Sequence, residues 1–362
     1  MRVVVLHGPG VDCHRPSLER WCAAQEGVAV ELVVCGDAES LLRELSTPAP
    51  VILAPGALRG DAEVQAAAAA RAAGPLIWLE LEAALSPPPT ALAQARVQTV
   101  RGRGIDGHRW ALRSLLERAA WPWVTHAYGD GRDQVGDLRL PAGAAPPAGF
   151  PVVALLHGGA WRAQWERDLM DALAVDLARR GYASWNVEYR RVGEGGGWPQ
   201  TFDDVAAAID LLPQLDAPLD LDRVALLGHS AGGHLALWAA ARGSASLVVS
   251  LAGLPDMAET SRRATYDDGA TALLGGRPDA FPERYALASP QELLPLGVRQ
   301  LLVHGTADQP DNVDMNRSYA ERAAAAGDWV ELLELEGVEH FAPIEPRSAA
   351  WATIASRLEA LL

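Results

Sequence analysis

The chain has no lysine, only three cysteines and no apolar run long enough to cross a membrane. Arginine supplies all 31 basic residues against 46 acidic ones, for a formal net charge of −15. Binding of DNA or RNA needs clustered positive charge on the protein surface, so we expect no nucleic-acid partner. The alanine-rich stretch AEVQAAAAARAAG carries charged residues and favours a helix of a globular protein, so we expect no membrane partner either.

The three cysteines, Cys13, Cys22 and Cys35, all lie in the first tenth of the chain. They show neither CxxC nor Cys/His ligand spacing, and an odd number cannot all pair within one chain. We therefore expect reduced structural thiols, with no metal and no cofactor. The first residues enter a strand pattern at once, without the basic and apolar segments of a signal peptide. The expected location is cytoplasmic.

Apolar β-branched runs alternate with helical patterns in the first third of the chain. Strands are expected at 2–6, 28–34, 50–54 and 75–80, with helices at 16–25, 61–73 and 107–119. This βαβα alternation predicts a parallel sheet with helices on both faces.

A second series begins near residue 120. WVTHAYGDGRDQVGDLRLP alternates polar and apolar residues around Gly-Asp-Gly, which predicts an antiparallel hairpin. Strands then follow near 151–156, 182–187, 223–227, 246–251, 299–303 and 329–335. We therefore expect two α/β domains, 1–119 and 120–362, the second with a mostly parallel sheet behind an antiparallel hairpin.

The strongest chemical signal is G-x-S-x-G, present as Gly228-His229-Ser230-Ala231-Gly232 between an apolar strand and an apolar helix. A sharp strand-to-helix turn exposes the serine hydroxyl, and glycines at −2 and +2 remove side chains that would collide. Ser230 is the predicted nucleophile. His229 and, further on, His234 are interpreted as structural.

A serine nucleophile needs a base and a group that orients the base. Asp308 follows the strand of QLLVHGTAD, and His340 follows the last strand, in the chain order Ser, acid, His. Asp311 and Asp314 are alternatives for the acid, and the distance from the strand end favours Asp308.

The remaining part of the site is expected in LLHGGAW, 155–161. Glycines after a buried strand let backbone N–H groups face a developing oxyanion. The candidate donors are Gly158, Gly159, Ala160 and Ala231. His157 is interpreted as a structural hydrogen-bonding residue beneath this loop.

These residues resemble the α/β-hydrolase superfamily, in the branch with an HGG-x-W loop that includes kynurenine formamidase-like enzymes, small carboxylesterases and hormone-sensitive-lipase relatives. The resemblance runs from about Val124 to the C-terminus, through HGGAWRAQWERDLMDALAVDLARRGYASWNVEYRR, GGWPQTFDDVAAAIDLL and GHSAGGHLALWAA. Ala160 stands where lipase relatives often have a third glycine. The resemblance implies a Ser-His-Asp triad and an acyl-enzyme.

The substrate is expected to be a small ester or an aryl formamide or amide. The segment between residue 251 and Asp308 suffices for a few short helices but not for a large lid, so a long lipid is not expected. The candidates for an aromatic pocket are Trp161, Trp165, Trp198 and Tyr266. Tryptophan in such positions is at least as often part of the hydrophobic core.

The first 118 or so residues resemble a different family, the type II 3-dehydroquinases. The matching fragments are VVVLHGPG, VILAPGAL, PLIWLELEA and GRGIDGHRWALRSLLE, in family order on a flavodoxin-like alternation. The resemblance implies a catalytic Tyr and Arg on a lid and a catalytic His, but this sequence has no Tyr there and Glu80 in place of that His. The simplest interpretation is a retained fold with a lost site, and a new pocket containing His7, His14 and Glu80 is the alternative.

Three functions follow from these patterns. The first is a serine hydrolase with an inactive dehydroquinase-like domain attached. The second is a bifunctional protein whose first domain acts as a lyase or binds a small cyclic metabolite. The third is a non-enzymatic protein in which the first domain mediates assembly, since dehydroquinases are oligomers; the intact triad disfavours this for the whole chain. We expect a small-molecule substrate and a homo-oligomer.

Overall fold

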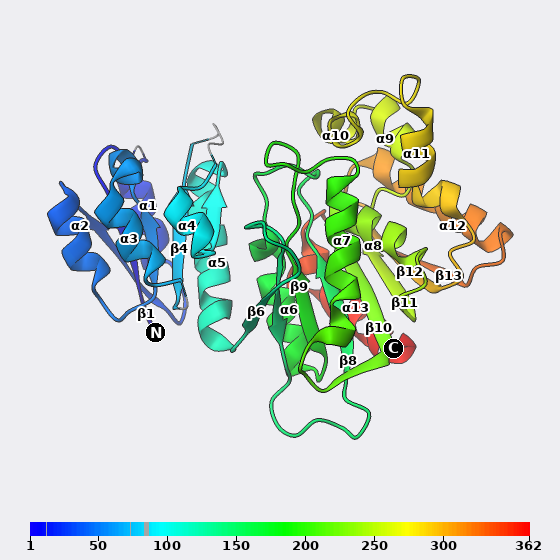
Figure 1. Ribbon diagram of the computed structural model, residues 1–362, viewed down its shortest axis with the longest axis horizontal. Helices are drawn as coiled ribbons and strands as arrows, with labels where there is room; N and C mark the ends of the chain where they lie inside the picture. The colour runs from blue at the N-terminus through cyan, green and yellow to red at the C-terminus, as the bar shows by residue number, and fades with distance from the viewer. Residues whose placement is uncertain (12, 73, 83–86) are drawn as a thin grey trace. The chain divides into compact units, whose positions relative to one another are not determined.

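The computed structural model describes residues 1–11, 13–72, 74–82 and 87–362, which form two compact units, Met1–Trp121 and Pro122–Leu362 (Figure 1). Residue 73 of the helix expected at 61–73 lies outside these ranges. None of the helices within them is both long and apolar enough to span a bilayer.

The first unit is built on a five-stranded, all-parallel sheet in the order β2-β1-β3-β4-β5. Its strands are β1 (Arg2–His7), β2 (Ala29–Val34), β3 (Val51–Ala54), β4 (Leu76–Glu80) and β5 (Thr99–Arg101). Its helices are α1 (Arg15–Ala23), α2 (Ala38–Leu45), α3 (Ala62–Ala69), α4 (Thr90–Gln94) and α5 (Gly107–Ala120). The sequence analysis missed β5, because a three-residue strand has too few positions to show a period.

The central strands of this unit are buried, as expected for a parallel sheet covered on both faces. Val3, Val5 and Leu6 of β1 are fully buried, as are Val51, Ile52 and Leu53 of β3. Side chains of α2 and α3, including Leu41 and Val64, complete the core beside them.

The second unit contains an eight-stranded sheet in the order β13-β12-β11-β10-β8-β9-β7-β6. Its strands are β6 (Val124–Ala127), β7 (Val135–Arg139), β8 (Phe150–Leu156), β9 (Ala183–Val187), β10 (Leu219–His229), β11 (Leu247–Leu251), β12 (Arg299–Gly305) and β13 (Val330–Leu335). β6 and β7 pair as the predicted antiparallel hairpin, β7 also runs antiparallel to β9, and the other pairs are parallel. The predicted α/β fold class is confirmed.

Helices cover the second sheet and extend beyond one of its ends. Five of these helices are α6 (Asp171–Arg179), α7 (Gln200–Asp210), α8 (Ala231–Ala240), α12 (Pro310–Ala325) and α13 (Ala349–Leu361). Three further helices, α9 (Met257–Arg262), α10 (Thr265–Leu274) and α11 (Pro282–Ala288), gather at one end of this unit (Figure 1). They follow β11, and α10 carries two of the residues that line the site described next.

Candidate active site

Ser230, the predicted nucleophile, occupies the turn between β10 and α8. Its backbone has φ 54° and ψ −119°, a conformation that L-residues rarely adopt. Its N–H donates to the carbonyl of Leu251 at 2.8 Å, which anchors the turn to the neighbouring strand. A Cβ on Gly228 would lie 2.0 Å from the carbonyl oxygen of Gly232, and one on Gly232 would lie 2.0 Å from that of Leu156. Both glycines are therefore required by close backbone packing.

Asp308 and His340 meet in the loops that follow β12 and β13. His340 Nδ1 lies 2.6 Å from Asp308 Oδ2, and Asp308 Oδ1 accepts a hydrogen bond from the Gln309 N–H at 2.7 Å. Burial opposes ionisation of Asp308, but its contacts with His304 and His340 hold the pKa of this carboxyl well below its usual range. The pair can therefore hold a neutral or protonated imidazole in one orientation.

His304 also contacts this carboxylate, although the sequence analysis gave it no role in the site. It lies near the end of β12, is 1% exposed, and places Nε2 3.2 Å from Asp308 Oδ2. Asp314, one of the two predicted alternatives for the acid, does not share this position. Asp314 is paired with Arg263 at 3.1 Å on the surface, and the side chain of Asp311 lies outside the described part of the chain.

Ser230 and His340 are linked through the residue before the serine, because His229 Nε2 donates to the backbone carbonyl of His340. Among the hydrogen bonds of the described residues there is none between Ser230 Oγ and His340 Nε2. Tyr266 and Ser230 line the same cavity, and the rings of Tyr266 and His340 are 5.7 Å apart between centroids. Catalytic hydrogen bonds are often long before substrate binds and tighten in the complex, so this arrangement is compatible with a serine–histidine pair.

The loop after β8 carries the predicted oxyanion donors. Gly159 has φ +116°, and the two non-glycine residues that follow, Ala160 and Trp161, also have positive φ, at 53° and 58°. In the described chain, the N–H groups of Gly159, Ala160 and Ala231 donate no hydrogen bond. A Cβ on Gly158 would lie 3.1 Å from Ser230 Cβ, so this loop passes directly beside the nucleophile. Free N–H groups beside a serine are the arrangement that an oxyanion hole requires.

A buried network of charges supports this loop from beneath. His157 Nδ1 donates to the carbonyl of Gly158 at 2.8 Å, and His157 Nε2 lies 3.0 Å from Glu188 Oε1. Burial opposes the charge on Glu188, but Arg191 and His157 lower the pKa of this carboxyl to about 2. Arg191 is fully buried and also pairs with Asp133 at 3.0 Å. His157 thus sits where a structural hydrogen-bonding residue was predicted.

The two histidines near Ser230 point away from its hydroxyl. His229 Nε2 donates to the backbone carbonyl of His340 at 2.9 Å. His234 is fully buried, donates from Nε2 to the carbonyl of Ala288 and accepts from Trp161 Nε1 at 3.2 Å. Burial lowers the pKa of His234 to about 4, so this ring is neutral near pH 7. His229 connects the serine turn to the histidine loop, and His234 belongs to the core.

A cavity of about 350 Å³ opens beside Ser230. The residues around it are Gly159, Ala160, Arg162, Gln164, Trp165, Leu169, Ser230, Tyr266, Asp267 and Phe341. Of the predicted aromatic candidates, Trp165 and Tyr266 contribute to this lining. Trp161 is fully buried in the core, and Trp198 packs edge-on against Phe202 with their centroids 4.9 Å apart. Neither of these two tryptophans lines the cavity.

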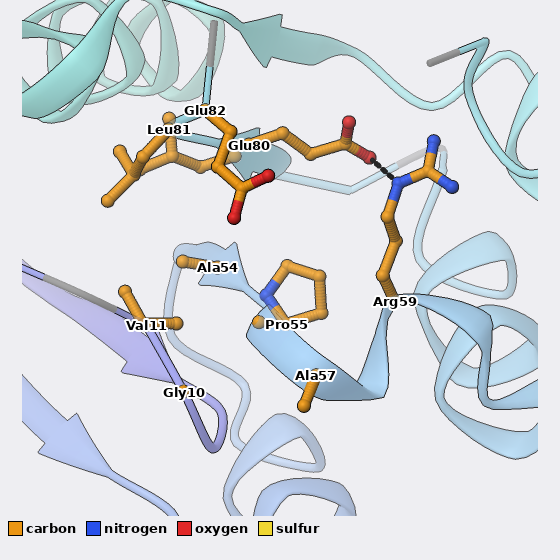
Figure 2. Close-up of a pocket in the computed structure, with 11 residues that line it drawn as sticks. Gly10, Val11, Ala54, Pro55, Ala57, Arg59, Glu80, Leu81 and Glu82 are labelled. Atoms are coloured by element: carbon orange, nitrogen blue, oxygen red, sulfur yellow. Dashed lines mark hydrogen bonds and ion pairs between the residues drawn. The ribbon is translucent and has the colours of Figure 1, made fainter. Parts of the chain in front are cut away.

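The first unit has a separate cavity of about 400 Å³ at the carboxyl ends of β1, β3 and β4. Ligand sites of open parallel sheets lie at this edge, where the strand order reverses. Figure 2 shows Glu80 and Glu82 on one side of the cavity and Pro55 and Ala57 on the other. Glu80 Oε1 accepts from Arg59 at 2.9 Å and from Trp78 Nε1 at 2.7 Å, so its charge is already paired.

His7 and His14 do not join Glu80 in this cavity. His7 is 2% exposed, and its Nε2 lies 2.9 Å from Nε2 of the buried His108. Burial and the neighbouring His108 lower the pKa of His7 to about 4. His14 is exposed and contacts Ser17. The three residues proposed for an alternative pocket are therefore separate. Within the described ranges, no three His, Cys, Asp or Glu side chains are grouped so that they could hold a metal ion.

Several solved structures share the fold of much of this chain. A bacterial heroin esterase has 23% identity and a TM-score of 0.57, over 78% of this chain and 92% of its own. Esterase B from Lactobacillus rhamnosis HN001 has 19% identity and a TM-score of 0.59, over 70% and 91%. A bifunctional GH43-CE protein of Bacteroides eggerthii has 22% identity and a TM-score of 0.57, over 65% of this chain and 37% of its own, so this chain spans well under half of that relative. These likenesses show the α/β-hydrolase fold.

The sequence comparison with families gives a more specific result. No curated protein matches the chain. The BD-FAE family model matches residues 137–322, just over half of the 362 residues. Ser230 and Asp308 lie inside the matched region, and His340 follows it. The chain belongs to the BD-FAE family.

Proposed function

We propose that the Pro122–Leu362 unit is a serine hydrolase that cleaves small carboxylic esters through an acyl-enzyme. The observation that carries this proposal is the 2.6 Å contact between His340 Nδ1 and Asp308 Oδ2 beside a serine on a strained strand-to-helix turn. A nucleophile, a base and a group that orients the base are the parts that this chemistry needs. The esterases that share the fold, described above, add support.

In the proposed mechanism, bound substrate brings Ser230 Oγ into contact with His340 Nε2. His340 takes the hydroxyl proton as Oγ attacks the ester carbonyl, while Asp308 holds the imidazole at Nδ1. The free N–H groups of Gly159 and Ala231 stabilise the oxyanion of the tetrahedral intermediate, with Gly158 and Ala160 as further candidates. His340 then gives its proton to the departing alcohol, and water hydrolyses the acyl-enzyme.

The cavity favours a small substrate. Its volume of about 350 Å³ lies at the low end of the usual range for ligand pockets. Trp165 and Phe341 pack with their ring centroids 5.9 Å apart and form an apolar wall, which suits a short acyl group or an aryl ring. An aryl formamide is the second substrate class that we propose, because the loop HGGAW resembles that of formamidase-like enzymes.

Labelling with a fluorophosphonate and turnover of p-nitrophenyl acetate test the hydrolase proposal. The wild-type chain should be labelled once per chain and should release p-nitrophenolate, and Ser230→Ala should abolish both. Ser261→Ala is a suitable control, because Ser261 bonds with Thr271 and lies outside the cavity lining. Failure of the wild type to label or turn over, or full activity in Ser230→Ala, would refute the proposal.

For the Met1–Trp121 unit we propose a dehydroquinase-like domain without that catalytic activity. The strand order β2-β1-β3-β4-β5 supports a flavodoxin-like fold, and Glu80, in place of the expected histidine, is paired with Arg59 and Trp78. Addition of 3-dehydroquinate should therefore give no rise in enone absorbance. Sustained turnover would show that this unit is an active lyase.

We also propose a cytoplasmic location and a role for the first unit in homo-oligomer formation. Among the described residues Cys13, Cys22 and Cys35 form no disulfide, and burial is the main cause that raises the pKa of Cys22 and of Cys35. Light scattering of the intact chain tests the oligomer: a mass near 38.5 kDa would refute it.

A further inference from the structure

Both ring nitrogens of His157 face hydrogen-bond acceptors. The ring is fully buried, and the residue directly precedes the glycines of the oxyanion loop. Nδ1 lies 2.8 Å from the carbonyl oxygen of Gly158, and Nε2 lies 3.0 Å from Oε1 of Glu188. A carbonyl oxygen only accepts, so Nδ1 carries a proton. Whether Nε2 also carries one depends on the ionisation of Glu188.

The hydrogen bonds around Glu188 show that this side chain is a carboxylate. Its Oε1 accepts from the Tyr189 N–H at 3.1 Å and from the Arg191 guanidinium, and its Oε2 accepts from the Arg167 N–H at 2.8 Å. All three partners are donors, so none of them can accept a carboxyl proton. Burial opposes the charge, but Arg191 and His157 lower the pKa of this carboxyl to about 2. His157 Nε2 therefore also donates, and the ring holds two protons and a positive charge.

The two arginines near Glu188 each have a second carboxylate partner. Arg191 also pairs with Asp133 at 3.0 Å. Arg167 also pairs with Asp137 at 3.0 Å. These buried acids offset the repulsion between the arginines and a charged histidine ring, and they leave the Glu188 carboxylate available to that ring.

A stacked tyrosine provides further support for the charged ring. Tyr189 lies against His157 with the ring centroids 4.3 Å apart and 7° between the ring planes. The face of an aromatic ring attracts a cation, so this contact stabilises the protonated histidine. The hydroxyl of Tyr189 donates to the His157 carbonyl at 2.7 Å, which fixes the two residues relative to each other.

The hydrogen bond at Nδ1 orients one donor of the oxyanion loop. The Gly158 carbonyl and the Gly159 N–H belong to one planar trans peptide and point in opposite directions. Because His157 holds the carbonyl on its own side, the N–H is directed away from the histidine, and Gly159 lines the cavity together with Ser230. A cation bonded to the carbonyl also polarises this peptide, because hydrogen bonds in a chain strengthen one another.

We infer that His157 is a protonated positioning residue, which orients and polarises the peptide between Gly158 and Gly159 so that its N–H binds the oxyanion. This inference rests on the proposed esterase function. The chain of contacts runs from Glu188 through the imidazolium and the peptide to the carbonyl oxygen of the substrate. His157 keeps both protons throughout the reaction. Its effect grows as negative charge develops on the substrate oxygen, so it stabilises the transition state more than the bound substrate.

NMR of the full chain with isotope-labelled histidine nitrogens tests the charge of His157. The sequence has nine histidines, and the spectrum of His157→Asn identifies the signals of this one by their loss. At pH 8, where a histidine in water is neutral, we expect two ring N–H protons on His157. A single ring proton at this pH would overturn the inference, whether or not the chain is an esterase. If the variant does not fold, a wild-type spectrum without any doubly protonated histidine at pH 8 would also overturn it.

Hydrolysis of p-nitrophenyl acetate tests what the charge does. Asn places its amide near the position of Nδ1, so His157→Asn should keep a neutral donor to the Gly158 carbonyl. Gln reaches the position of Nε2, so His157→Gln should lose that donor. We expect kcat and kcat/KM to fall together at constant KM, about 10-fold in His157→Asn and about 100-fold in His157→Gln. The inhibition constant of a trifluoromethyl ketone, which forms an oxyanion on serine, should rise by the same factors.

The matched control is His126→Asn, because His126 lies on β6 and outside the cavity lining. It should keep the wild-type kinetics. Unchanged kcat in both His157 variants, or a change confined to KM, would overturn the inference while the esterase proposal stands. A wild type that neither labels with fluorophosphonate nor turns over would instead refute the esterase, and the NMR spectrum would still decide the charge of the ring.

Discussion

The side chain of His229 donates a hydrogen bond from Nε2 to the backbone carbonyl of His340, across 2.9 Å. The two residues are 111 positions apart in the chain, and their ring centroids are 4.7 Å apart. One lies immediately before Ser230 and the other is its proposed base. This bond therefore couples the position of the histidine loop to that of the serine turn.

Loss of this bond should reduce activity more than stability. We expect His229→Ala to lower kcat about 10-fold, because a histidine loop without this tie presents Nε2 to Ser230 in a smaller fraction of molecules. His229→Gln, which can still donate to the carbonyl, should recover part of the rate. Steady-state kinetics of the three proteins measure this effect, and equal kcat values in His229→Ala and wild type would contradict it.

Asp308→Asn should lower kcat far more than His229→Ala does. An amide in place of the carboxylate can hold the imidazole in the wrong tautomer, and such a change lowers kcat by about 10³- to 10⁴-fold in a serine triad while KM changes little. The matched control is Asp314→Asn, which breaks a surface pair with Arg263 and should keep wild-type kinetics. If both variants lose activity equally, the assignment of Asp308 as the acid is wrong.

The buried charges beneath the oxyanion loop should dominate the stability of this region. Arg191→Met would remove one partner each from Glu188 and Asp133 in a site with little solvent access. Glu188 would keep His157, and Asp133 would keep Arg132. Removal of one member of a buried ion pair costs about 3–5 kcal/mol. Arg317→Met, which breaks an exposed pair with Glu334, should cost less than about 1 kcal/mol.

Urea unfolding of the two arginine variants, followed by tryptophan fluorescence, measures these differences. A change below about 1 kcal/mol in Arg191→Met would mean that water or rearranged side chains compensate the buried acids.

The pH dependence of stability should reflect His234. Its folded pKa is about 4, below the ordinary value of 6.5, because burial disfavours the charged ring. Below pH 6.5 the unfolded chain therefore binds a proton that the folded chain excludes, so the stability contributed by the neutral ring is present above pH 6.5 and is lost as the pH falls toward 4.

Thermal unfolding at pH 7, 6, 5 and 4.5 checks this expectation. The melting temperature of the second unit should fall over this series, and the fall should be smaller in His234→Gln, whose side chain does not titrate. Identical pH profiles of the two proteins would show that other groups control the acid sensitivity.

The sequence by itself determined the local parts of this protein. Alternation of apolar runs predicted the parallel strands, because strands buried on both faces need continuous apolar residues. G-x-S-x-G predicted the turn at Ser230, because only glycine tolerates the 2.0 Å approaches found at Gly228 and Gly232. The chain order and strand ends also singled out Asp308 and His340, which the structure brings to 2.6 Å.

Only the tertiary structure decided which other side chains reach this site. Tyr266, Asn312 and His304 belong to no recognisable motif, and their convergence depends on how α10 and α12 pack over the sheet. The same holds for the tryptophans: Trp161 and Trp165 are four positions apart, yet one is buried in the core and the other lines the cavity, because the positive φ values at 159–161 turn the chain between them. Neighbouring residues in the sequence determine the conformation of a turn, whereas contacts between distant segments determine which side chains surround it.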